Sequence, residues 1–271
     1  MVSLIGVGDN TIDRYIDMNM MYPGGNAVNV SVFFKRMGGE ACYLGWLGDD
    51  RRGHLVLDSL QAEGVDVSHC RVVAHPTGRC DVELRGGDRH FIGSFPGARN
   101  LIHLTERDFD HISSYDIIHT SIYSFIEPQL QSLKQVSNLL SFDYSSDWTH
   151  EYLKTTLPRV DTAFLSSPNL NDAMVEKLIK WIQAECRGLA VITRGVKGSV
   201  AYDGYEIVHQ GTVETDVIDT LGAGDSFIAR MLYETQMDVE LGEAMSLAAE
   251  SAAKTCTYYG AWGHGVPIEE P

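Results

Sequence analysis

The sequence is poor in cysteine and places none of its cysteines at a spacing typical of metal sites. Its five cysteines include no Cys-x-x-Cys pair and are odd in number, and they stand at Cys42, Cys70, Cys80, Cys186 and Cys256. The ten histidines are also scattered, without His-x-x-x-His spacing. Neither pattern fits a disulfide framework or a zinc site. We therefore expect reduced thiols and no structural metal.

Basic charge and long apolar runs are also scarce. Lysine and arginine number 21 against 37 acidic residues, so the formal net charge is −16. Such a balance argues against a nucleic-acid or anionic-membrane surface. No apolar run reaches the roughly 20 residues that a membrane span needs. Because the chain opens on a strand-like segment at 2–8, without a basic leader, we expect a cytoplasmic protein that is not exported.

What the sequence does contain is an alternation of short apolar runs with helical patterns. Its 271 residues and 44% hydrophobic content suit one large domain over 1–271. Alternating strands and helices predict a mostly parallel sheet with helices on both faces, an α/β fold. Strands are expected at 4–8, 41–47, 116–120, 140–143, 162–166, 189–193 and 213–218. Helices are expected at 27–37, 53–63, 128–138, 172–185, 223–234 and 239–257.

Two segments, at about 11–22 and 71–95, break this alternation. Both show the one-sided polar and apolar pattern of half-exposed strands, and 78–84 and 89–95 flank a hairpin turn, Arg85-Gly86-Gly87-Asp88. They predict a small antiparallel β sheet beside the main domain. Such a sheet could cover a site as a lid, or join two copies into a homodimer, and the two roles are compatible.

A glycine-rich turn near the C-terminus carries the strongest chemical signal. Asp219-Thr220-Leu221-Gly222-Ala223-Gly224-Asp225-Ser226-Phe227 leads into a helical pattern. The free N–H groups and the helix dipole at such a turn suit a phosphate or another oxyanion. A carboxylate at Asp225 fits there if it removes a proton from the group that attacks the phosphate. The alternative is that Asp225 only complements the helix N-terminus.

A second glycine turn opens the first helix. In Pro23-Gly24-Gly25-Asn26-Ala27-Val28-Asn29-Val30 the two asparagines project from nearly one side of the first helical turn. They could hold sugar hydroxyls, while an N-cap role for Asn26 is the alternative. Asp9 and Asp13 follow the first strand, at the end of the sheet where ligands bind, and could grip vicinal hydroxyls or simply form turns.

A third turn, Thr193-Arg194-Gly195-Val196-Lys197-Gly198-Ser199, follows a later strand. It supplies a hydroxyl, two cations and two glycines, which are suitable neighbours for a nucleotide. A plain β-turn with solvated charges would have the same composition.

In this order along the chain, the motifs resemble the PfkB/ribokinase family of carbohydrate kinases. Residues 24–29 are similar to its N-terminal signature and 219–227 to its C-terminal signature. Gly48-Asp49-Asp50 with Gly53, and 193–198, also fit. The resemblance covers nearly the whole chain. It implies a ribokinase-like fold, ATP with Mg²⁺ as cofactors, and a small-molecule sugar substrate.

The resemblance also implies roles for individual residues. Asp225 would be the catalytic base, and the amides of Gly222, Ala223 and Gly224 the anion hole. The remaining implied groups are, for the sugar, Asp9, Asp13, Gly25, Asn26 and Asn29, and for ATP, Asn169, Thr193 and Gly195. Asp172 stands where the family has a glutamate, so its shorter side chain would reach Mg²⁺ through water. Asp219 matches a residue beside which many relatives bind a monovalent cation, and Arg230 replaces a small residue.

Within the family, Gly8-Asp9-Asn10, Trp46-Leu47-Gly48-Asp49-Asp50 and Tyr259-Gly260-Ala261-Trp262 resemble kinases of Amadori products, which are ketosamines such as fructoselysine. The implied reaction is phosphoryl transfer to a primary hydroxyl. The amino-acid part of such a substrate needs a charged partner, for which the lid region offers Arg79, Arg89 and Arg99.

Other functions stay open. One is a family kinase acting on fructose, ribose, a nucleoside or a keto-deoxy sugar acid, and another is a non-catalytic sugar-binding regulator on the same fold. A dinucleotide-dependent oxidoreductase fits poorly, because the first strand leads into Gly8-Asp9-Asn10 rather than Gly-x-Gly-x-x-Gly.

Overall fold

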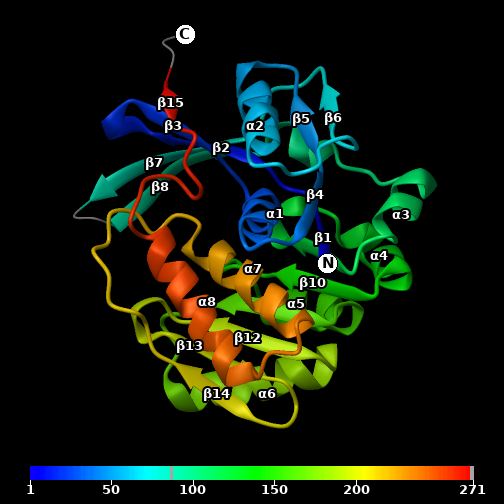
Figure 1. Ribbon diagram of the computed structural model, residues 1–271, viewed down its shortest axis with the longest axis vertical. Coiled ribbons are helices and arrows are strands. Elements are labelled where there is room, and N and C mark those ends of the chain that lie inside the picture. The colour runs from blue at the N-terminus through cyan, green and yellow to red at the C-terminus, as the bar shows by residue number, and fades with distance from the viewer. Residues whose placement is uncertain (86–87, 269–271) are drawn as a thin grey trace.

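The computed structural model, which describes residues 1–85 and 88–268, is built on an eight-stranded sheet (Figure 1). Its strand order is β14-β13-β12-β11-β10-β9-β1-β4. Neighbours from β12 to β4 pair in parallel, while β13 and β14 add antiparallel at one edge. The strands are β1 (Ser3–Val7), β4 (Glu40–Leu44), β9 (Ile117–Ser121), β10 (Leu139–Asp143), β11 (Thr162–Ser166), β12 (Leu189–Thr193), β13 (Ser199–Tyr202) and β14 (Ile207–Gln210).

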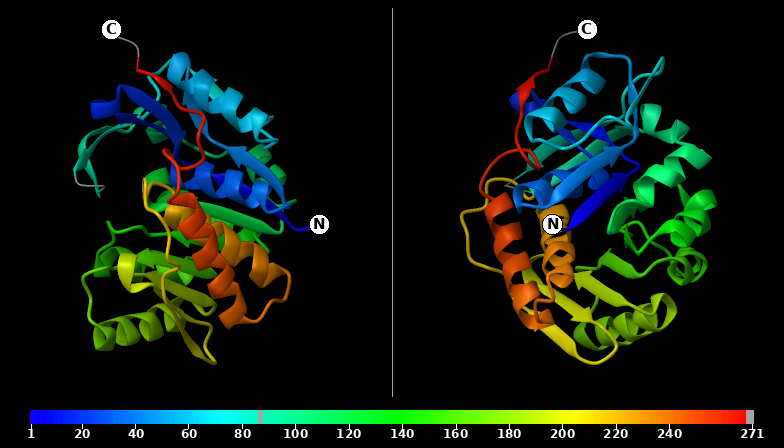
Figure 2. Two further views of the ribbon diagram at one scale, coloured as in Figure 1. Left: turned by 60° about the vertical axis from the view of Figure 1, so that its left-hand side comes forward. Right: turned by 45° about the vertical axis from the view of Figure 1, so that its right-hand side comes forward.

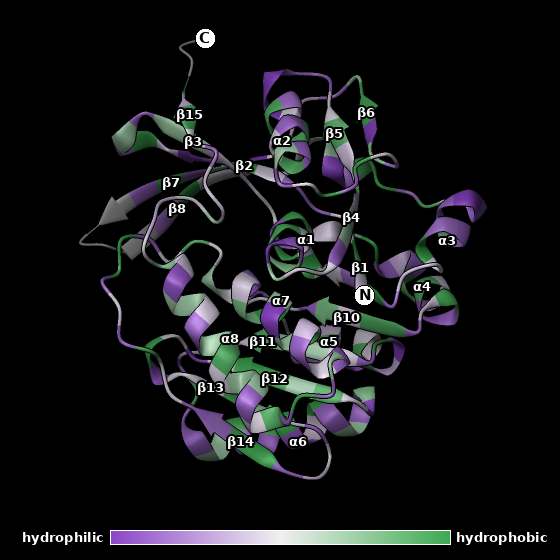
Figure 3. Cartoon of the chain, viewed as in Figure 1, coloured by the Kyte–Doolittle hydropathy of each residue, from purple (hydrophilic) through white to green (hydrophobic). Residues whose placement is uncertain are grey.

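Helices cover both faces of this sheet, as the alternation of strand and helix patterns predicts. The two faces form separate cores because successive strand residues point to opposite sides, so that Ile117 joins one core and Ile118 the other. Figure 3 shows the central strands mostly green and the surface helices mixed. The helices are α1 (Asn26–Arg36), α2 (Arg51–Ala62), α3 (Glu106–Ile112), α4 (Leu130–Val136), α5 (His150–Thr156), α6 (Asp172–Cys186), α7 (Ala223–Gln236) and α8 (Leu241–Thr255).

One core lies under α1, α7 and α8, and the other under α4, α5 and α6. Phe34, Met231 and Met245 represent the first three helices in their core, and Leu133 and Ile179 represent α4 and α6 in theirs. Because each helix buries one apolar stripe, this packing fixes the directions in which the helix N-termini point. The short 3₁₀ turns between elements are η1 (Ile16–Met18), η2 (Gly97–Leu101), η3 (Ile122–Ser124), η4 (Glu127–Gln129), η5 (Leu157–Arg159) and η6 (Gly195–Lys197).

A second, smaller sheet stands at one side of the main body (Figure 2). Its order is β15-β3-β2-β7-β8, in which β2 and β7 pair in parallel and the other neighbours antiparallel. This confirms the small sheet expected from the two half-exposed segments. Its strands are β2 (Thr11–Tyr15), β3 (Met20–Gly24), β7 (Arg79–Arg85), β8 (Asp88–Phe95) and β15 (Val266–Pro267), and β5 (Trp46–Gly48) and β6 (Arg71–Val73) form a separate pair. Residues 86–87 of the predicted hairpin turn lie outside the described residues.

Two expected strands differ from the structure. The run 41–47 is broken into β4 and β5 at Gly45, where a Cβ would lie 2.0 Å from the Tyr43 hydroxyl and 2.7 Å from the Gly8 carbonyl. The run 213–218 is not a strand but an irregular segment, because its apolar side chains Val217 and Ile218 are about half exposed and bury too little surface to join a sheet.

All five cysteines are free thiols. Among residues 1–85 and 88–268, no helix is both long enough and apolar enough to pass through a membrane.

Candidate active site

The carboxyl ends of β1, β9 and β10 meet the N-terminus of α1 at one edge of the sheet, and Asp9 holds this junction together. Its carboxylate accepts hydrogen bonds from the backbone amides of Asn26 (2.7 Å) and Ala27 (3.2 Å). The hydroxyls of Ser121 (2.8 Å) and Ser124 (3.1 Å) donate to it as well. Asp9 is 1% exposed. Asp9, which was expected to bind the sugar, is therefore buried behind the N-terminus of α1, where its carboxylate caps the first two amides of the helix.

Two residues that are distant in sequence, Asn29 and Asp225, come together in front of this junction. The Asn29 amide nitrogen donates to the Asp225 carboxylate (2.7 Å), and the Trp262 indole N–H donates to the Asn29 amide oxygen (2.7 Å). Asp225 lies in the first turn of α7 and is 9% exposed. Because Trp262 fixes which end of the amide faces Asp225, the carboxylate is held in one orientation. The sequence signatures give Asn29 and Asp225, but not the indole that orients them.

The glycine turn before α7 leaves open space at its second glycine. Gly222 has a φ of +77°, and a Cβ there would lie 2.5 Å from the Ala261 Cβ. A Cβ on Gly224 would meet no atom within 4 Å. The amide of Ala223 already donates to the Thr220 carbonyl (3.3 Å). Of the two glycines in the predicted anion hole, Gly224 is therefore the one whose Cβ position borders open space.

Asp13, on the second sheet, lies close to the Asn29–Asp225 pair. It is 3% exposed, on β2, and its carboxylate lies so close to Gly24 that a Cβ on this glycine would be 2.3 Å away. The same point is 3.8 Å from the Asn29 amide oxygen. Gly24 therefore lets the Asp13 carboxylate approach the Asn29–Asp225 pair. Gly25 has a different role, because its φ of +116° and its contact with Asn10 show that it shapes the chain rather than a ligand surface.

Asn26 is hydrogen-bonded to Asp143, at the end of β10. The sequence did not identify this carboxylate as a site residue. The Asn26 amide nitrogen donates to Asp143, which also accepts from the Ser145 backbone amide (2.8 Å). Burial raises the pKa of Asp143 to about 6, opposed by these two hydrogen bonds and reinforced by the nearby charge of Asp9. Its position at the carboxyl end of a predicted parallel strand was the available signal.

Asp219 joins the second sheet to the turn before α7. Its carboxylate is fully buried and accepts hydrogen bonds from the Tyr15 hydroxyl and from the backbone amides of Leu221 (2.9 Å) and Gly260 (3.0 Å). These three donors come from three separate parts of the chain. Asp219 therefore fixes the base of the second sheet relative to the glycine turn.

The residues expected to border a nucleotide lie together at the ends of β11 and β12. The Thr193 hydroxyl donates to the Leu165 carbonyl (3.3 Å), while Gly195 and Asn169 are exposed. Asp172 begins α6, and its largely exposed carboxylate pairs with the buried Arg194 guanidinium (2.8 Å). This ion pair occupies the side chain that was expected to reach Mg²⁺ through water. Arg230, the other departure from the family pattern, pairs with Glu234 one turn further along α7 (2.6 Å).

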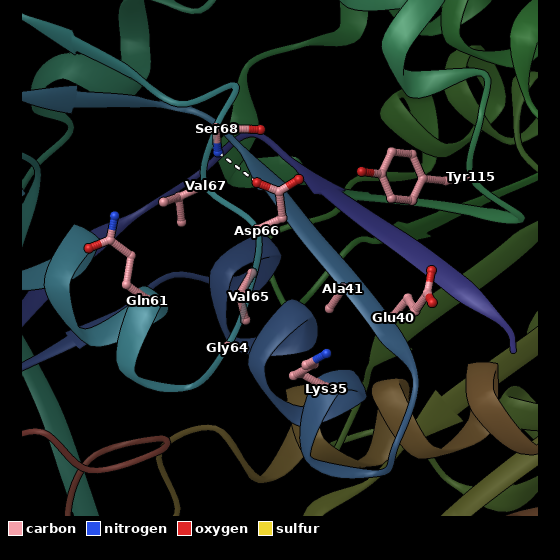
Figure 4. Close-up of a pocket in the computed structure, with 10 residues that line it drawn as sticks. All are labelled: Lys35, Glu40, Ala41, Gln61, Gly64, Val65, Asp66, Val67, Ser68 and Tyr115. Carbon is pink, nitrogen blue, oxygen red and sulfur yellow. Dashed lines mark hydrogen bonds between the residues drawn. The ribbon is translucent and has the colours of Figure 1, made fainter.

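A cavity of about 630 Å³ lies elsewhere, where α1 ends and β4 begins (Figure 4). Lys35, Glu40 and Tyr115 line it, and Asp66 within it accepts a hydrogen bond from the Ser68 amide (2.8 Å). Its ten lining residues include none of the predicted site residues. This cavity is therefore separate from the candidate site.

The chain is similar to known proteins over nearly its whole length. Residues 9–267 match the model of the pfkB family of carbohydrate kinases. The chain is 40% identical to fructosamine kinase FrlD of Bacillus subtilis (strain 168), over 98% of this chain and 95% of that protein. It is 36% identical to fructoselysine 6-kinase of Escherichia coli (strain K12), over 97% of this chain and 100% of that protein.

Solved structures of two sugar kinases share the fold. The ribokinase of Thermotoga maritima superposes with a TM-score of 0.78 at 20% identity, covering 99% of this chain and 97% of that one. A fructokinase with bound ATP from Xylella fastidiosa gives 0.79 at 20% identity, covering 96% and 94%. These likenesses confirm the expected ribokinase-like architecture. With the family match over nearly the whole length and relatives at 36–40% identity, the chain belongs to the pfkB family of carbohydrate kinases.

Proposed function

We propose that this carbohydrate kinase transfers the γ-phosphate of ATP to a primary hydroxyl of an Amadori-type ketosamine such as fructoselysine. The observation that carries the chemistry is the fixed carboxylate of Asp225 beside the open N-terminal turn of α7. The substrate class is supported by the names of the relatives at 36–40% identity, a fructosamine kinase and a fructoselysine 6-kinase.

Phosphoryl transfer needs a base for the attacking hydroxyl and donors for the charge on the phosphoryl group. Asp225 would accept the hydroxyl proton as attack begins. Its carboxylate is oriented for this by the Asn29 amide, which Trp262 holds in place. The amides at the start of α7, that of Gly224 above all, would face the phosphoryl oxygens. General-base catalysis of this kind contributes about 10²- to 10⁴-fold to a rate.

The sugar would lie between Asp13 on the second sheet and the first turn of α1. Two vicinal hydroxyls can donate to one carboxylate, and the buried Asp13 faces this space from above. Asp9 and Gly25 would act from below, by fixing the helix end that presents Asn26 and Asn29. The second sheet, over the segments about 11–22 and 71–95, would exclude water that otherwise competes as phosphate acceptor.

ATP would lie against the turns after β11 and β12, close to Asn169, Thr193 and Gly195. Among the described residues no group of three acidic, histidine or cysteine side chains could hold a metal ion. Mg²⁺ in such sites usually keeps several waters and is held by phosphates with one or two carboxylates, which suits an indirect contact with Asp172. A monovalent cation at Asp219 fits less well, because three donors already surround this carboxylate.

The decisive experiment is a substrate panel of fructoselysine, another fructosamine, fructose, ribose and a keto-deoxy sugar acid. ADP formation is followed by a coupled assay, and the phosphorylated carbon is identified by phosphorus NMR. We expect the ketosamines to give the highest kcat/KM and a phosphate ester at the primary hydroxyl. A preference for an unmodified sugar would rule out the ketosamine assignment, and sugar-dependent thermal stabilisation without any ADP would indicate a binding regulator.

The second sheet also offers a surface for a second copy of the chain. Ile16 and Ile92 are 41% and 48% exposed on its segments, and β8 is its edge strand in the described residues. We include a homodimer through this sheet in the proposal. Light scattering across a concentration series, with Ile92→Asp as the disrupting variant, tests it, and a monomer at every concentration would exclude it.

A further inference from the structure

Arg99 is a buried cation that forms no ion pair with any side chain that the structure describes. It lies in η2, only 7% of its surface is exposed, and its Nε atom is enclosed without a hydrogen-bond partner. Throughout residues 1–85 and 88–268, no hydrogen bond or ion pair reaches its guanidinium. Arg194 is buried to the same degree but donates to Leu170 (3.1 Å) and pairs with Asp172 (2.8 Å).

An unpaired buried charge is costly, and proteins retain one mainly where something else neutralises it. This chain carries 37 acidic residues and a net charge of −16, so a carboxylate partner would have been easy to provide. The missing partner therefore indicates an anion that arrives from outside.

The backbone around Arg99 is held against the base of the second sheet. The Ala98 amide donates to the Pro76 carbonyl (2.8 Å), and the Gly78 carbonyl accepts from the Ile12 amide on β2 (2.9 Å). Gly97, with a φ of +61°, lies so close to Gly78 that a Cβ would be 2.3 Å from the Gly78 nitrogen. The main chain at Arg99 is thus fixed to the strand that carries Asp13.

The side chain is near the inner face of that sheet. Asp13, Cys80 and Ser94 are directly paired across β2, β7 and β8, so their side chains share one face. Asp13 brings this face to Gly24 and Asn29. Burial raises the pKa of the Cys80 thiol, Asp13 raises it further, and the charge of Arg99 lowers it. Cys80 therefore lies within the electrostatic reach of both Asp13 and Arg99.

Arg99 also lies within electrostatic reach of Tyr43, whose hydroxyl holds the loop that follows β1. This hydroxyl donates to the Gly8 carbonyl (2.7 Å) and accepts from Asn10 (2.9 Å). Burial raises the pKa of this hydroxyl above its usual range, and Arg99 is the cation that opposes the rise. Asp225, in the first turn of α7, is connected to α1 through its hydrogen bond with Asn29.

We propose that Arg99 binds a carboxylate on the amino-acid part of the substrate, a role that rests on the proposed ketosamine kinase function. A guanidinium recognises a carboxylate through two parallel hydrogen bonds, which gives both affinity and orientation. Asp13 then holds hydroxyls of the sugar, and Arg99 holds the group that distinguishes a glycated amino acid from a plain ketose. The other two arginines of the lid region suit this role less. Arg79 is 38% exposed and packs over Phe95, and the Arg89 side chain lies outside the described residues.

The test compares two substrates that differ only in this charge, fructosyl-glycine and fructosyl-glycinamide. We expect wild-type protein to favour the acid by about 10- to 100-fold in kcat/KM, mainly through a lower KM. A charged hydrogen-bonded contact changes affinity by about this much, one to two log units. Arg99→Gln should bring both compounds to the level of the amide with kcat nearly unchanged. Arg99→Lys should keep part of the preference, and the exposed control Arg107→Gln should keep all of it.

The outcomes separate this inference from the proposed function. Equal kcat/KM for acid and amide in wild-type protein, or an undiminished preference in Arg99→Gln, overturns the role of Arg99 while the ketosamine function stands. If neither compound is phosphorylated but another sugar is, the proposed function fails, and the role of Arg99, which rests on it, fails with it. If Arg99→Gln does not fold, the wild-type pair and Arg99→Lys still decide.

Discussion

At the scale of single residues, the proposed reaction depends on the carboxylate of Asp225, which Asn29 and Trp262 hold in place. Replacing Asp225 with Asn keeps the shape and the contact with Asn29 but removes the proton acceptor. We expect kcat to fall by about 10²- to 10⁴-fold while the affinity for sugar changes little. Steady-state kinetics with direct binding measurements test this, with the exposed Asp58→Asn as control. Turnover close to wild type would remove Asp225 from the role of base.

Trp262 acts on the Asp225 carboxylate indirectly, through the amide of Asn29. Trp262→Phe preserves most of the buried ring but removes the N–H that fixes the Asn29 amide. The amide can then rotate and present its oxygen to Asp225, so we expect a lower kcat with a smaller change in KM. Trp181→Phe, on α6, serves as the matched control. Equal losses in both variants would show that ring packing, not the hydrogen bond, is responsible.

The buried Asp143 gives a prediction about pH. Burial raises its folded-state pKa from the ordinary 3.8 of an aspartate to about 6, so between these two pH values the folded protein binds more protons than the unfolded chain. This group therefore adds stability below about pH 4 and loses it as the pH rises through 6. Asp143→Asn removes the titration, and its stability relative to wild type should be greater at pH 8 than at pH 5, by about 1.4 kcal/mol, because about one pH unit of this interval lies below the raised pKa.

Urea unfolding of both proteins at the two pH values measures this difference directly. A stability difference between wild type and Asp143→Asn that is independent of pH would contradict the raised pKa.

At the scale of elements, the first turn of α7 separates a structural glycine from a functional one. Gly222→Ala places a side chain at φ +77° and 2.7 Å from the Ala261 Cα, so a loss of stability of about 1–3 kcal/mol is expected. Gly224→Ala meets no neighbour within 4 Å and should leave the melting temperature nearly unchanged. Its methyl group would instead occupy the space proposed for the phosphate, so the KM for ATP or kcat should suffer.

Thermal melts and kinetics on the two variants test this contrast. It fails if Gly224→Ala is as unstable as Gly222→Ala, or if it is fully active.

Sequence patterns predicted best those strands and helices whose apolar pattern is complete within their own residues. The strands 162–166 and 189–193 agree with β11 and β12, and 172–185 differs from α6 by one residue. Each of these carries a complete apolar period. The seven-residue helices α3 and α5 were missed, although the equally short α4 was expected within 128–138. The break at Gly45 depends on Gly8 and Tyr43, and no local pattern contains that contact.

The same limit applied to the candidate site. The two glycine signatures predicted Asn29 and Asp225, but their pairing joins positions 196 residues apart. Asp9 was expected beside the sugar because an acid after the first strand usually meets a ligand. Its four hydrogen bonds to the protein could not be foreseen, since Ser121 and Ser124 come from another strand end. Charge partners are decided by tertiary structure, so neither the pairing of Asp172 nor the isolation of Arg99 could be predicted from spacing.

At the scale of the whole molecule, the site lies where three structural layers meet. The parallel sheet supplies strand ends, the helices α1 and α7 supply N-termini, and the second sheet supplies Asp13 from the opposite side. Asp219 links these parts, since its partners Tyr15, Leu221 and Gly260 belong to the second sheet, the glycine turn and the C-terminal segment. A change in any one layer therefore alters the geometry of the other two.

The C-terminal segment gives this arrangement a consequence for biosynthesis. Trp262 and β15 lie within the last ten residues or so of the chain, yet β15 pairs with β3, and Trp262 supports Asn29, both near the beginning. A nascent chain emerges from the ribosome N-terminus first, so the early strands and the first helix wait for these partners until residues 262–267 have been synthesised. A premature stop before codon 262 would therefore leave all eight strands of the main sheet in the chain but remove the indole that orients Asn29 toward Asp225.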